Sequence, residues 1–250
     1  MRIPFGCRSL RWTLGAAALA LMFGAQGEAV EAPDSIRQLM LKMDAAMKGI
    51  RSAECTFKKR VRPKNKLMPL EEMRLKSNTK GDVYIRWTGK RHHGREVLYR
   101  PAHHNGKLVY KAPVVNLKLD PLGTMAMAGN RHSIKEAGIL FTTKRILQDV
   151  WYIDKHPDAA ESYTDLGPRT VSGGPSHCFI SVTPRANYKG FYTDKSEICI
   201  HDQTFLPTYM KNWEQQGEHF VLVEEFSWER CEINHLDKKD FDIENPQYGF

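Results

Sequence analysis

Apolar and polar residues alternate along much of this chain, and this alternation limits its fold more than any other feature. It is clearest at Ala53, Cys55 and Phe57, with Val61 in the same phase. It returns in four short segments, at residues 83–87, 97–99, 108–110 and 115–119. Successive side chains of a strand point to opposite faces, so this pattern predicts an antiparallel sheet with one buried face and one face in water.

The last third of the chain carries further strand patterns, at residues 177–183, 197–201, 207–213 and 220–228. Short connections separate these segments, which predicts a meander of neighbouring strands. An Asn-Gly pair at residues 105–106 is a strong signal for a hairpin in the first half of the chain. The residues from Asp240 to Phe250 are expected to form an extended tail.

Two segments show helical periodicity instead. The capping box Ser35-Ile36-Arg37-Gln38 predicts the start of a helix that ends at Gly49. A second helix is expected from Ile134 to Ile153, with Ser133 as its N-cap. The chain is therefore expected to be mainly β, with two helices that pack on its core.

The first 27 residues are typical of a secretory signal peptide. Three arginines precede an apolar run over residues 13–25, which is too short to span a bilayer. The small residues Ala25 and Gly27 offer a cleavage site. An uncleaved N-terminal anchor is the alternative. Cleavage leaves residues 28–250 as a single domain, which is expected to be soluble and to reside in the periplasm.

Four cysteines lie beyond this segment, at Cys55, Cys178, Cys199 and Cys231. An even number in an exported protein favours disulfides, and four cysteines allow three pairings. If the turn between their strands centres near residues 186–192, Cys178 and Cys199 fall at the same level of two neighbouring antiparallel strands, within reach of a disulfide. Their pairing is predicted, and Cys55 with Cys231 follows by elimination if the first and last strands approach each other. Four free thiols are the alternative.

Known catalytic motifs are missing from the sequence, and no nucleophile stands beside a base. His93 and His104 could meet across a hairpin to bind a metal, but solvated histidines are the favoured interpretation. His132 and Glu136 lie one helical turn apart, as a general acid and base would. A structural pair is favoured there. We therefore expect no catalytic residue, no metal and no cofactor.

The formal net charge is +8, and basic residues cluster at residues 58–60 and 62–66. Such a cluster can contact anionic envelope lipid or a membrane-bound partner. A solvated loop is the favoured alternative. Nucleic acid is not expected as a partner, because an exported protein seldom meets it.

Several ordered motifs carry a resemblance to a known family. They are Gly94-Arg95-Glu96-Val97-Leu98-Tyr99, Asn105-Gly106-Lys107-Leu108, Leu119-Asp120-Pro121-Leu122-Gly123, Arg131-His132-Ser133-Ile134 and Asn245-Pro246-Gln247-Tyr248-Gly249-Phe250. Together they resemble the bacterial exported domain-of-unknown-function family fifteen seventy-one. The resemblance runs from about Ser35 to the end of the chain.

That family is similar to lipoprotein carriers and receptors of the LolA and LolB type. The resemblance implies an open antiparallel half-barrel whose helices cover the concave face and hold acyl chains against the sheet. It supplies no established binding residues. We therefore expect a monomeric, non-enzymatic binding protein for a lipid or an acylated protein. The alternatives are an envelope scaffold or protein-interaction module with a packed core, and, less favoured, a hydrolase.

The cavity of such a fold is expected between the apolar sides of the strands and the helices. Its predicted lining is Phe57, Leu75, Ile85, Trp87, Tyr99, Leu117, Leu119, Met40, Met43, Met47, Ile139, Ile146 and Val150. Residues 120–130 are rich in glycine and alanine and carry the flexible, apolar Met125 and Met127. We expect this segment to be a lid at the cavity mouth, with an ordered linker packed onto the core as the alternative.

Overall fold

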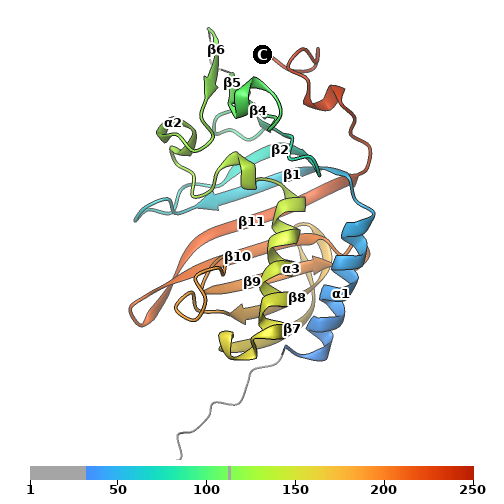
Figure 1. Ribbon diagram of the computed structural model, residues 1–250, viewed down its shortest axis with the longest axis vertical. Coiled ribbons are helices and arrows are strands. Elements are labelled where there is room, and N and C mark those ends of the chain that lie inside the picture. The colour runs from blue at the N-terminus through green and yellow to red at the C-terminus, as the bar shows by residue number, and fades with distance from the viewer. Residues whose placement is uncertain (1–31, 112–113) are drawn as a thin grey trace, which may run out of the picture.

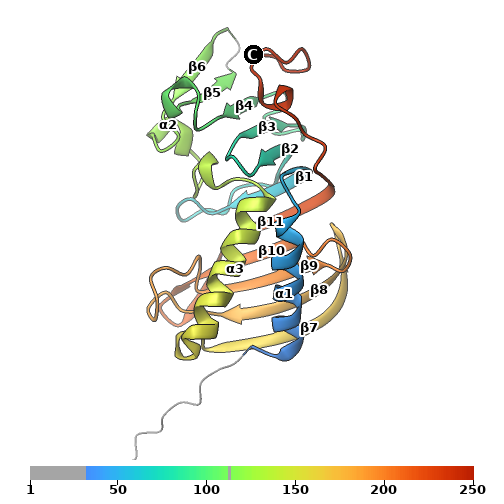
Figure 2. The ribbon, with the colours of Figure 1, turned by 45° about the vertical axis from the view of Figure 1, so that its right-hand side comes forward.

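The computed structural model describes residues 32–111 and 114–250, so the predicted signal peptide lies outside the described residues. Eleven strands form one antiparallel sheet in the order β6-β5-β4-β3-β2-β1-β11-β10-β9-β8-β7. The sheet is open and curved, with β6 and β7 at its edges (Figures 1 and 2). The strands are β1 (Ser52–Val61), β2 (Glu71–Asn78), β3 (Val83–Trp87), β4 (Glu96–Tyr99), β5 (Leu108–Lys111), β6 (Asn116–Leu119), β7 (Ser162–Val171), β8 (Gly174–Val182), β9 (Lys195–His201), β10 (Pro207–Gln216) and β11 (His219–Ile233).

Three α-helices accompany the sheet: α1 (Asp34–Lys48), α2 (Thr124–Met127) and α3 (Ile139–Lys155). Helices α1 and α3 lie side by side across the concave face of β7 to β11, while the short α2 lies near β5 and β6 (Figure 2). This is the open half-barrel with helices on its concave face that was expected. Within the described residues, no helix is long and apolar enough to cross a membrane.

Two meanders make up the sheet, and they meet where the first strand pairs with the last. β1 pairs with β11 in antiparallel register, with Phe57 opposite Trp228. Cys55 and Cys231 form a disulfide across this junction, with their Cα atoms 4.2 Å apart. A second disulfide joins Cys178 and Cys199, which are direct partners on β8 and β9. Both predicted pairings are present.

The start of α1 differs from the predicted capping box. The helix begins at Asp34, and the carbonyl of Pro33 accepts the N–H groups of Ile36 and Arg37. Ser35 lies inside the first turn, where its hydroxyl donates to Asp165 at 2.5 Å on the edge strand β7. The serine was therefore wrongly assigned as the cap, because its side chain finds a tertiary partner instead. The helix ends at Gly49, as predicted.

The second helix begins later than predicted, at Ile139. Ser133 caps a short 3-10 turn at residues 134–136, and Gly138 then separates that turn from α3. Gly138 has φ +104°, a backbone conformation that interrupts a helix and suits glycine. A Cβ atom at this position would lie 2.7 Å from the hydroxyl of Ser77, so the close packing against β2 also needs glycine.

Strands β2 and β7 were not recognised in the sequence. β7 contains Gly167 and Pro168 and carries a register irregularity between Asp165 and Gly167. Proline is tolerated there because β7 is an edge strand. In β2, Met73 and Leu75 are the only apolar residues, so the alternation is too short to stand out.

The convex face of the sheet is partly covered by the end of the chain. Tyr84, Leu98 and Phe241 form a small buried cluster there. Tyr248 stacks on Tyr84 with ring centroids 3.8 Å apart, and Lys76 pairs with Asp240 at 2.6 Å. The tail is irregular apart from one 3-10 turn, and it shields this part of the convex face, which was expected to be wet.

Candidate functional site

A cavity of about 430 Å³ lies between the concave face of the sheet and α3. Its volume falls within the roughly 300–1,000 Å³ that is usual for small-molecule sites. Both meanders contribute apolar side chains to its sheet wall, among them Phe57, Leu75, Ile85, Trp87, Val97, Phe179, Ile198, Met210, Phe226 and Trp228. The opposite wall comes from α3 and from the segment that precedes it, residues 125–138.

Many of the residues predicted for the cavity lie on its wall. These are Phe57, Leu75, Ile85, Trp87, Leu119, Ile146 and Val150, together with Met125 of the predicted lid. Trp87 is 9% exposed and lies on the concave side, where the parity of its strand predicts it. Other predicted residues lie outside the lining, namely Tyr99, Leu117, Met40, Met43, Met47, Ile139 and Met127.

Five of the residues outside the lining share a physical reason, which is that they belong to the packed core or pack against it. Met40 and Met43 have no exposed surface, because α1 packs its apolar side into the main core. Tyr99 and Ile139 belong to the same packed core, and Met47 packs against it from α1. Helical periodicity identifies the buried side of a helix. It does not distinguish a side that faces packed neighbours from one that faces open space.

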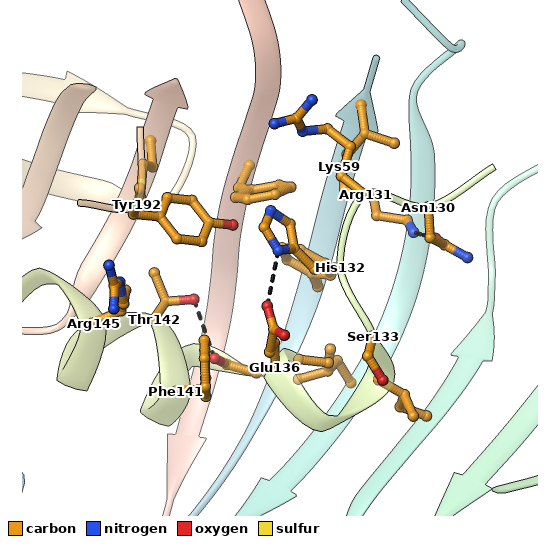
Figure 3. A pocket seen from close by; sticks show the side chains of 18 of the residues that line it. Lys59, Asn130, Arg131, His132, Ser133, Glu136, Phe141, Thr142, Arg145 and Tyr192 are labelled. Atoms are coloured by element: carbon orange, nitrogen blue, oxygen red, sulfur yellow. Dashed lines mark hydrogen bonds and ion pairs between the residues drawn. The ribbon is translucent and has the colours of Figure 1, made fainter. Parts of the chain in front are cut away.

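One side of the cavity is polar, which the strand and helix patterns of the sequence do not predict. The charged and hydrogen-bonding residues on this wall include Lys59, Asn130, Arg131, Glu136, Arg145, Asp149 and Tyr192. Figure 3 shows Tyr192, His132 and Glu136 facing one another there. Lys59 offered a signal, since it interrupts the apolar phase of Phe57 and Val61.

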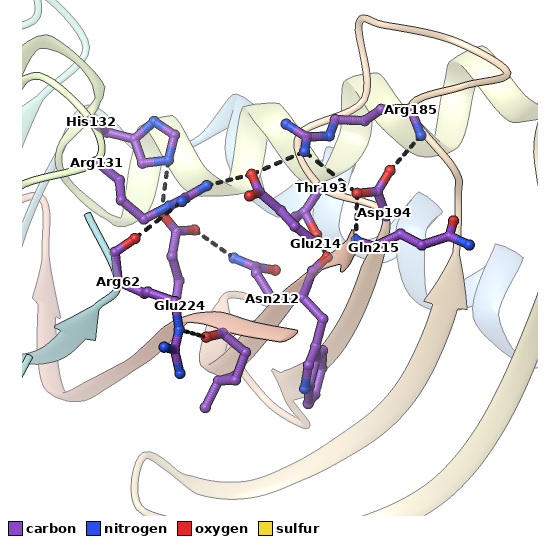
Figure 4. Close-up of polar contacts among 12 residues, drawn as sticks. Arg62, Arg131, His132, Arg185, Thr193, Asp194, Asn212, Glu214, Gln215 and Glu224 are labelled. Carbon is purple, nitrogen blue, oxygen red and sulfur yellow. Dashed lines mark hydrogen bonds and ion pairs between the residues drawn. The ribbon is translucent and has the colours of Figure 1, made fainter. Parts of the chain in front are cut away.

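A buried carboxylate organises this polar wall. Glu224 of β11 is 1% exposed, and its Oε1 lies 2.7 Å from His132 Nε2 and 3.1 Å from Arg131 Nε. Asn212 donates to its Oε2 at 2.9 Å (Figure 4). The network continues from Arg131 to Glu214 at 2.6 Å. These contacts tie the segment before α3 to the second meander.

The same network shifts the pKa values of its members. Burial by itself would lower the pKa of His132, but the hydrogen bonds and charges of Glu224 and Glu136 outweigh it and raise that pKa. Burial would likewise raise the pKa of Glu224, but His132, Arg131 and Asn212 outweigh it, so that pKa lies below its usual range. The arrangement therefore favours a charged imidazolium beside a charged carboxylate.

His132 and Glu136 are in contact, with Nδ1 2.8 Å from Oε2. Both ring nitrogens of His132 thus face carboxylates, and the ring stacks on Tyr192 with centroids 4.9 Å apart. The two carboxylates and the stacked ring of Tyr192 hold the imidazole of His132 in one orientation.

A second carboxylate of the wall, Asp149, lies on α3. Its Oδ2 accepts the N–H of Tyr192 at 3.2 Å, and its Oδ1 lies 3.2 Å from Arg145. Burial raises the pKa of Asp149 to about 6, although Arg145 and the backbone donor act in the opposite direction. The charge of this wall therefore changes over a pH range that cells and organelles experience.

Most of the basic cluster on β1 is neutralised by neighbouring strands. Lys58 pairs with Glu229 at 2.9 Å, and Arg60 pairs with Glu225. Lys59 points the other way, toward the cavity, where it donates to Asn130 at 2.5 Å and lies 3.8 Å from Glu71. Only the loop at residues 62–66 keeps exposed basic side chains from this cluster.

The histidine pairs do not assemble a metal site among the described residues. No group of three or more histidine, cysteine or carboxylate side chains there has a metal-binding arrangement. His93 contacts the carbonyl of Thr88 at 3.0 Å instead.

Both the sequence and the fold of this chain are similar to those of known proteins. The family described as "Protein of unknown function (DUF1571)" matches residues 50–250. No curated protein matches the chain in sequence. The lipoprotein LppX from Mycobacterium tuberculosis is 9% identical with a TM-score of 0.50, over 84% of this chain and 100% of LppX. That similarity shows a shared fold.

Two further solved structures are more distant. LprF from Mycobacterium bovis is 10% identical with a TM-score of 0.48, over 80% of this chain and 93% of LprF. A LolA superfamily protein from Nitrosomonas europaea is 11% identical with a TM-score of 0.34, over 82% of this chain and 96% of that protein.

Proposed function

This chain belongs to the DUF1571 family of proteins of unknown function, and from the cavity of this member we propose that it binds the acyl chains of a lipid or an acylated protein. The protein acts by binding rather than by catalysis. It holds its ligand between the concave face of the sheet and α3.

One observation carries the proposal: the cavity stays open although large apolar side chains surround it. Protein interiors normally pack to high density, so an unfilled, largely apolar space of about 430 Å³ calls for an occupant. Each methylene group buried there contributes about 0.8 kcal/mol. An acyl chain supplies many such groups without needing hydrogen bonds. A scaffold with a filled core would have no reason to keep this space.

The proposed compartment is the periplasm. Two disulfides support an oxidising environment outside the cytoplasm, because cytosolic proteins rarely keep such bonds. The basic, then apolar, N-terminal 27 residues support export by a signal peptide.

The segment of residues 120–130 is the proposed lid. It carries α2, and Met125 is 67% exposed while it also borders the cavity. A flexible apolar side chain in this position can cover a ligand of variable shape. Hydrogen exchange in residues 120–130 is expected to slow when lipid is added. Equal protection with and without lipid would argue for a fixed linker.

The proposal is tested first on the native protein. Protein purified from the periplasm of a Gram-negative host is examined by native mass spectrometry, and co-purified lipid is expected. The delipidated protein is then titrated with dodecanol, an uncharged single-chain ligand. A correctly folded protein that neither carries lipid nor binds dodecanol would contradict the proposal.

A cavity-filling variant provides the second test. Thr142 lies on the cavity wall in the first turn of α3, and Gln148 lies exposed on the same helix. Thr142→Trp is expected to weaken dodecanol binding at least about tenfold by occupying the cavity. Gln148→Trp is the matched control and should bind like the wild type. Thermal unfolding of both variants shows whether the fold is retained.

A further inference from the structure

Arg95 occupies an unusual place on the cavity wall. It directly precedes β4, and its carbonyl accepts the N–H of Trp87 at 3.0 Å, which fixes its backbone beside the end of β3. Its guanidinium carbon lies 5.6 Å from the ring centroid of Trp87 and 5.6 Å from that of Tyr110. Two aromatic rings thus hold a half-buried cation at the cavity, a geometry that attracts a guanidinium to ring faces.

The guanidinium of Arg95 has no carboxylate partner among the described residues. The other two arginines of the cavity wall do have partners. Arg131 lies 2.6 Å from Glu214, and Arg145 lies 3.2 Å from Asp149. A guanidinium presents five N–H donors and stays charged, so the donors of Arg95 are available to solvent or to a ligand.

The surroundings of Arg95 carry an excess of positive charge. Glu71 is shared between two of the neighbouring cations, with Arg91 at 3.5 Å and Lys59 at 3.8 Å. Burial lowers the pKa of the nearby His92, and the charges of Arg95, Arg91 and Lys59 lower it further. A single carboxylate therefore faces several cations in this part of the wall.

An apolar surface adjoins this charged end of the cavity. Ile85 lies on β3 with Trp87, Leu108 lies on β5 with Tyr110, and Val97 lies on β4 between these two strands; all of them line the cavity. A ligand that lays a hydrocarbon chain on this surface brings one end of the chain to the guanidinium. The guanidinium binds this end of the ligand best when the end is negatively charged and has oxygen atoms that accept hydrogen bonds from its planar set of N–H donors.

We infer that Arg95 binds the anionic group, a carboxylate or a phosphate, of an amphipathic ligand whose acyl chain occupies the cavity. This inference rests on the proposed function and narrows its ligand class to single-chain or multi-chain lipids with a negative head group. The aromatic rings of Trp87 and Tyr110 orient the guanidinium, and the anion completes its hydrogen bonds.

The first experiment compares two ligands of equal chain length on the wild-type protein. Dodecanoate carries a carboxylate, whereas dodecanol does not, so dodecanoate is expected to bind at least about tenfold more tightly at low salt. Raising the ionic strength should weaken dodecanoate binding and leave dodecanol binding unchanged. Equal affinities with no salt dependence would overturn the inference while leaving the proposed function intact.

The second experiment removes the charge. Arg95→Gln is expected to lose the preference for dodecanoate and to retain the affinity for dodecanol, and Arg95→Lys should recover part of the preference. Arg86→Gln is the matched control, because Arg86 is exposed and adjacent to Trp87 on the opposite face of β3. Dodecanoate binding by Arg95→Gln that equals the wild type would overturn the inference.

A competition with inorganic phosphate distinguishes a lipid head group from a free anion as the group that Arg95 binds. Phosphate alone is expected to displace dodecanoate only weakly, because it lacks the chain that the cavity holds. Displacement by phosphate as effective as that by unlabelled dodecanoate would identify a free-anion site and overturn the lipid assignment. Failure of the protein to bind either single-chain ligand would instead contradict the proposed function itself.

Discussion

At the scale of single residues, Glu224 shows how the fold maintains a charge in its interior. Burial of a carboxylate disfavours its charged form, yet its pKa is lowered because three donors surround it. Two of those donors, Arg131 and His132, come from the segment that leads into α3. The carboxylate therefore holds the cavity wall together and does not act as an isolated acid.

Replacing this carboxylate is expected to destabilise the protein. Glu224→Gln keeps the shape of the side chain but leaves Arg131 and His132 without their buried negative partner. We expect a loss of about 3–5 kcal/mol in the free energy of unfolding, which is typical of a broken buried ion pair. Urea denaturation at pH 7 measures it.

The adjacent glutamate provides the control for this measurement. Glu225 points to the other face of β11, where it pairs with the half-exposed Arg60. Glu225→Gln is expected to cost about 1 kcal/mol or less. Equal losses in the two variants would show that the network around Glu224 has no special structural role.

Asp149 makes stability depend on pH with a definite sign. Its pKa of about 6 lies above that of an unfolded aspartate, so the folded state binds the proton first as the pH falls. Above pH 6, the buried negative charge lowers the free energy of unfolding by its full amount. This loss disappears between about pH 6 and pH 4, as the carboxylate takes up a proton. From pH 7 to pH 5, this residue should add about 1 kcal/mol of stability.

The comparison with Asp149→Asn isolates this contribution from the other titrating groups. The free energy of unfolding is measured across pH 4–8 for both proteins. The wild type is expected to gain more stability than the variant as the pH falls. Parallel curves would mean that Asp149 titrates normally in the folded state.

At the scale of elements, the entry into α3 depends on one glycine. Gly138 combines φ +104° with a close approach to Ser77 of β2. The turn that it makes sets where α3 begins and therefore which residues of the helix face the cavity. A side chain at this position would meet both a strained backbone and an occupied space.

Gly138→Ala is accordingly expected to lower the free energy of unfolding by about 2–3 kcal/mol, which is in the range of backbone strain plus a steric clash. Gly49 at the end of α1 is the matched control. Its φ is −92°, and a Cβ atom there would touch only the Ala46 carbonyl at 3.8 Å. Gly49→Ala should be neutral or slightly stabilising. Thermal or urea unfolding that ranks the two variants in the opposite order would contradict this account.

At the scale of the whole molecule, the fold depends on the junction of two meanders. β1 and β11 are far apart in the sequence but are neighbours at the centre of the sheet. The cavity draws its wall from both meanders, so it exists only when this junction is formed. Cys55 and Cys231 link the two halves covalently across 176 residues.

The two disulfides should therefore differ in their contribution to stability. The loop closed by Cys55 and Cys231 is much longer than the 21-residue separation of Cys178 and Cys199. If disulfides stabilise by restricting the unfolded chain, removing Cys55–Cys231 lowers the free energy of unfolding by about 5 kcal/mol, and removing Cys178–Cys199 lowers it by about 3 kcal/mol. Paired serine replacements, Cys55→Ser with Cys231→Ser and Cys178→Ser with Cys199→Ser, are compared by denaturation. A larger loss for the second pair would exclude this explanation.

The local features of this protein could be predicted from the sequence. Alternation placed Phe57, Ile85 and Trp87 on one face of an antiparallel sheet, because side-chain direction on a strand follows directly from residue parity. The cysteine pairing Cys178–Cys199 followed from the same strand geometry.

What lies opposite each of those faces depends on how distant parts of the chain pack together. Helical periodicity at Met40 and Met43 and strand parity at Phe57 do not reveal that the two methionines meet packed neighbours while Phe57 meets open space, since both environments bury an apolar side chain. The polar wall around Glu224 and the aromatic setting of Arg95 likewise join residues from distant strands. Such contacts depend on long-range pairing, above all that of β1 with β11, which no local pattern encodes.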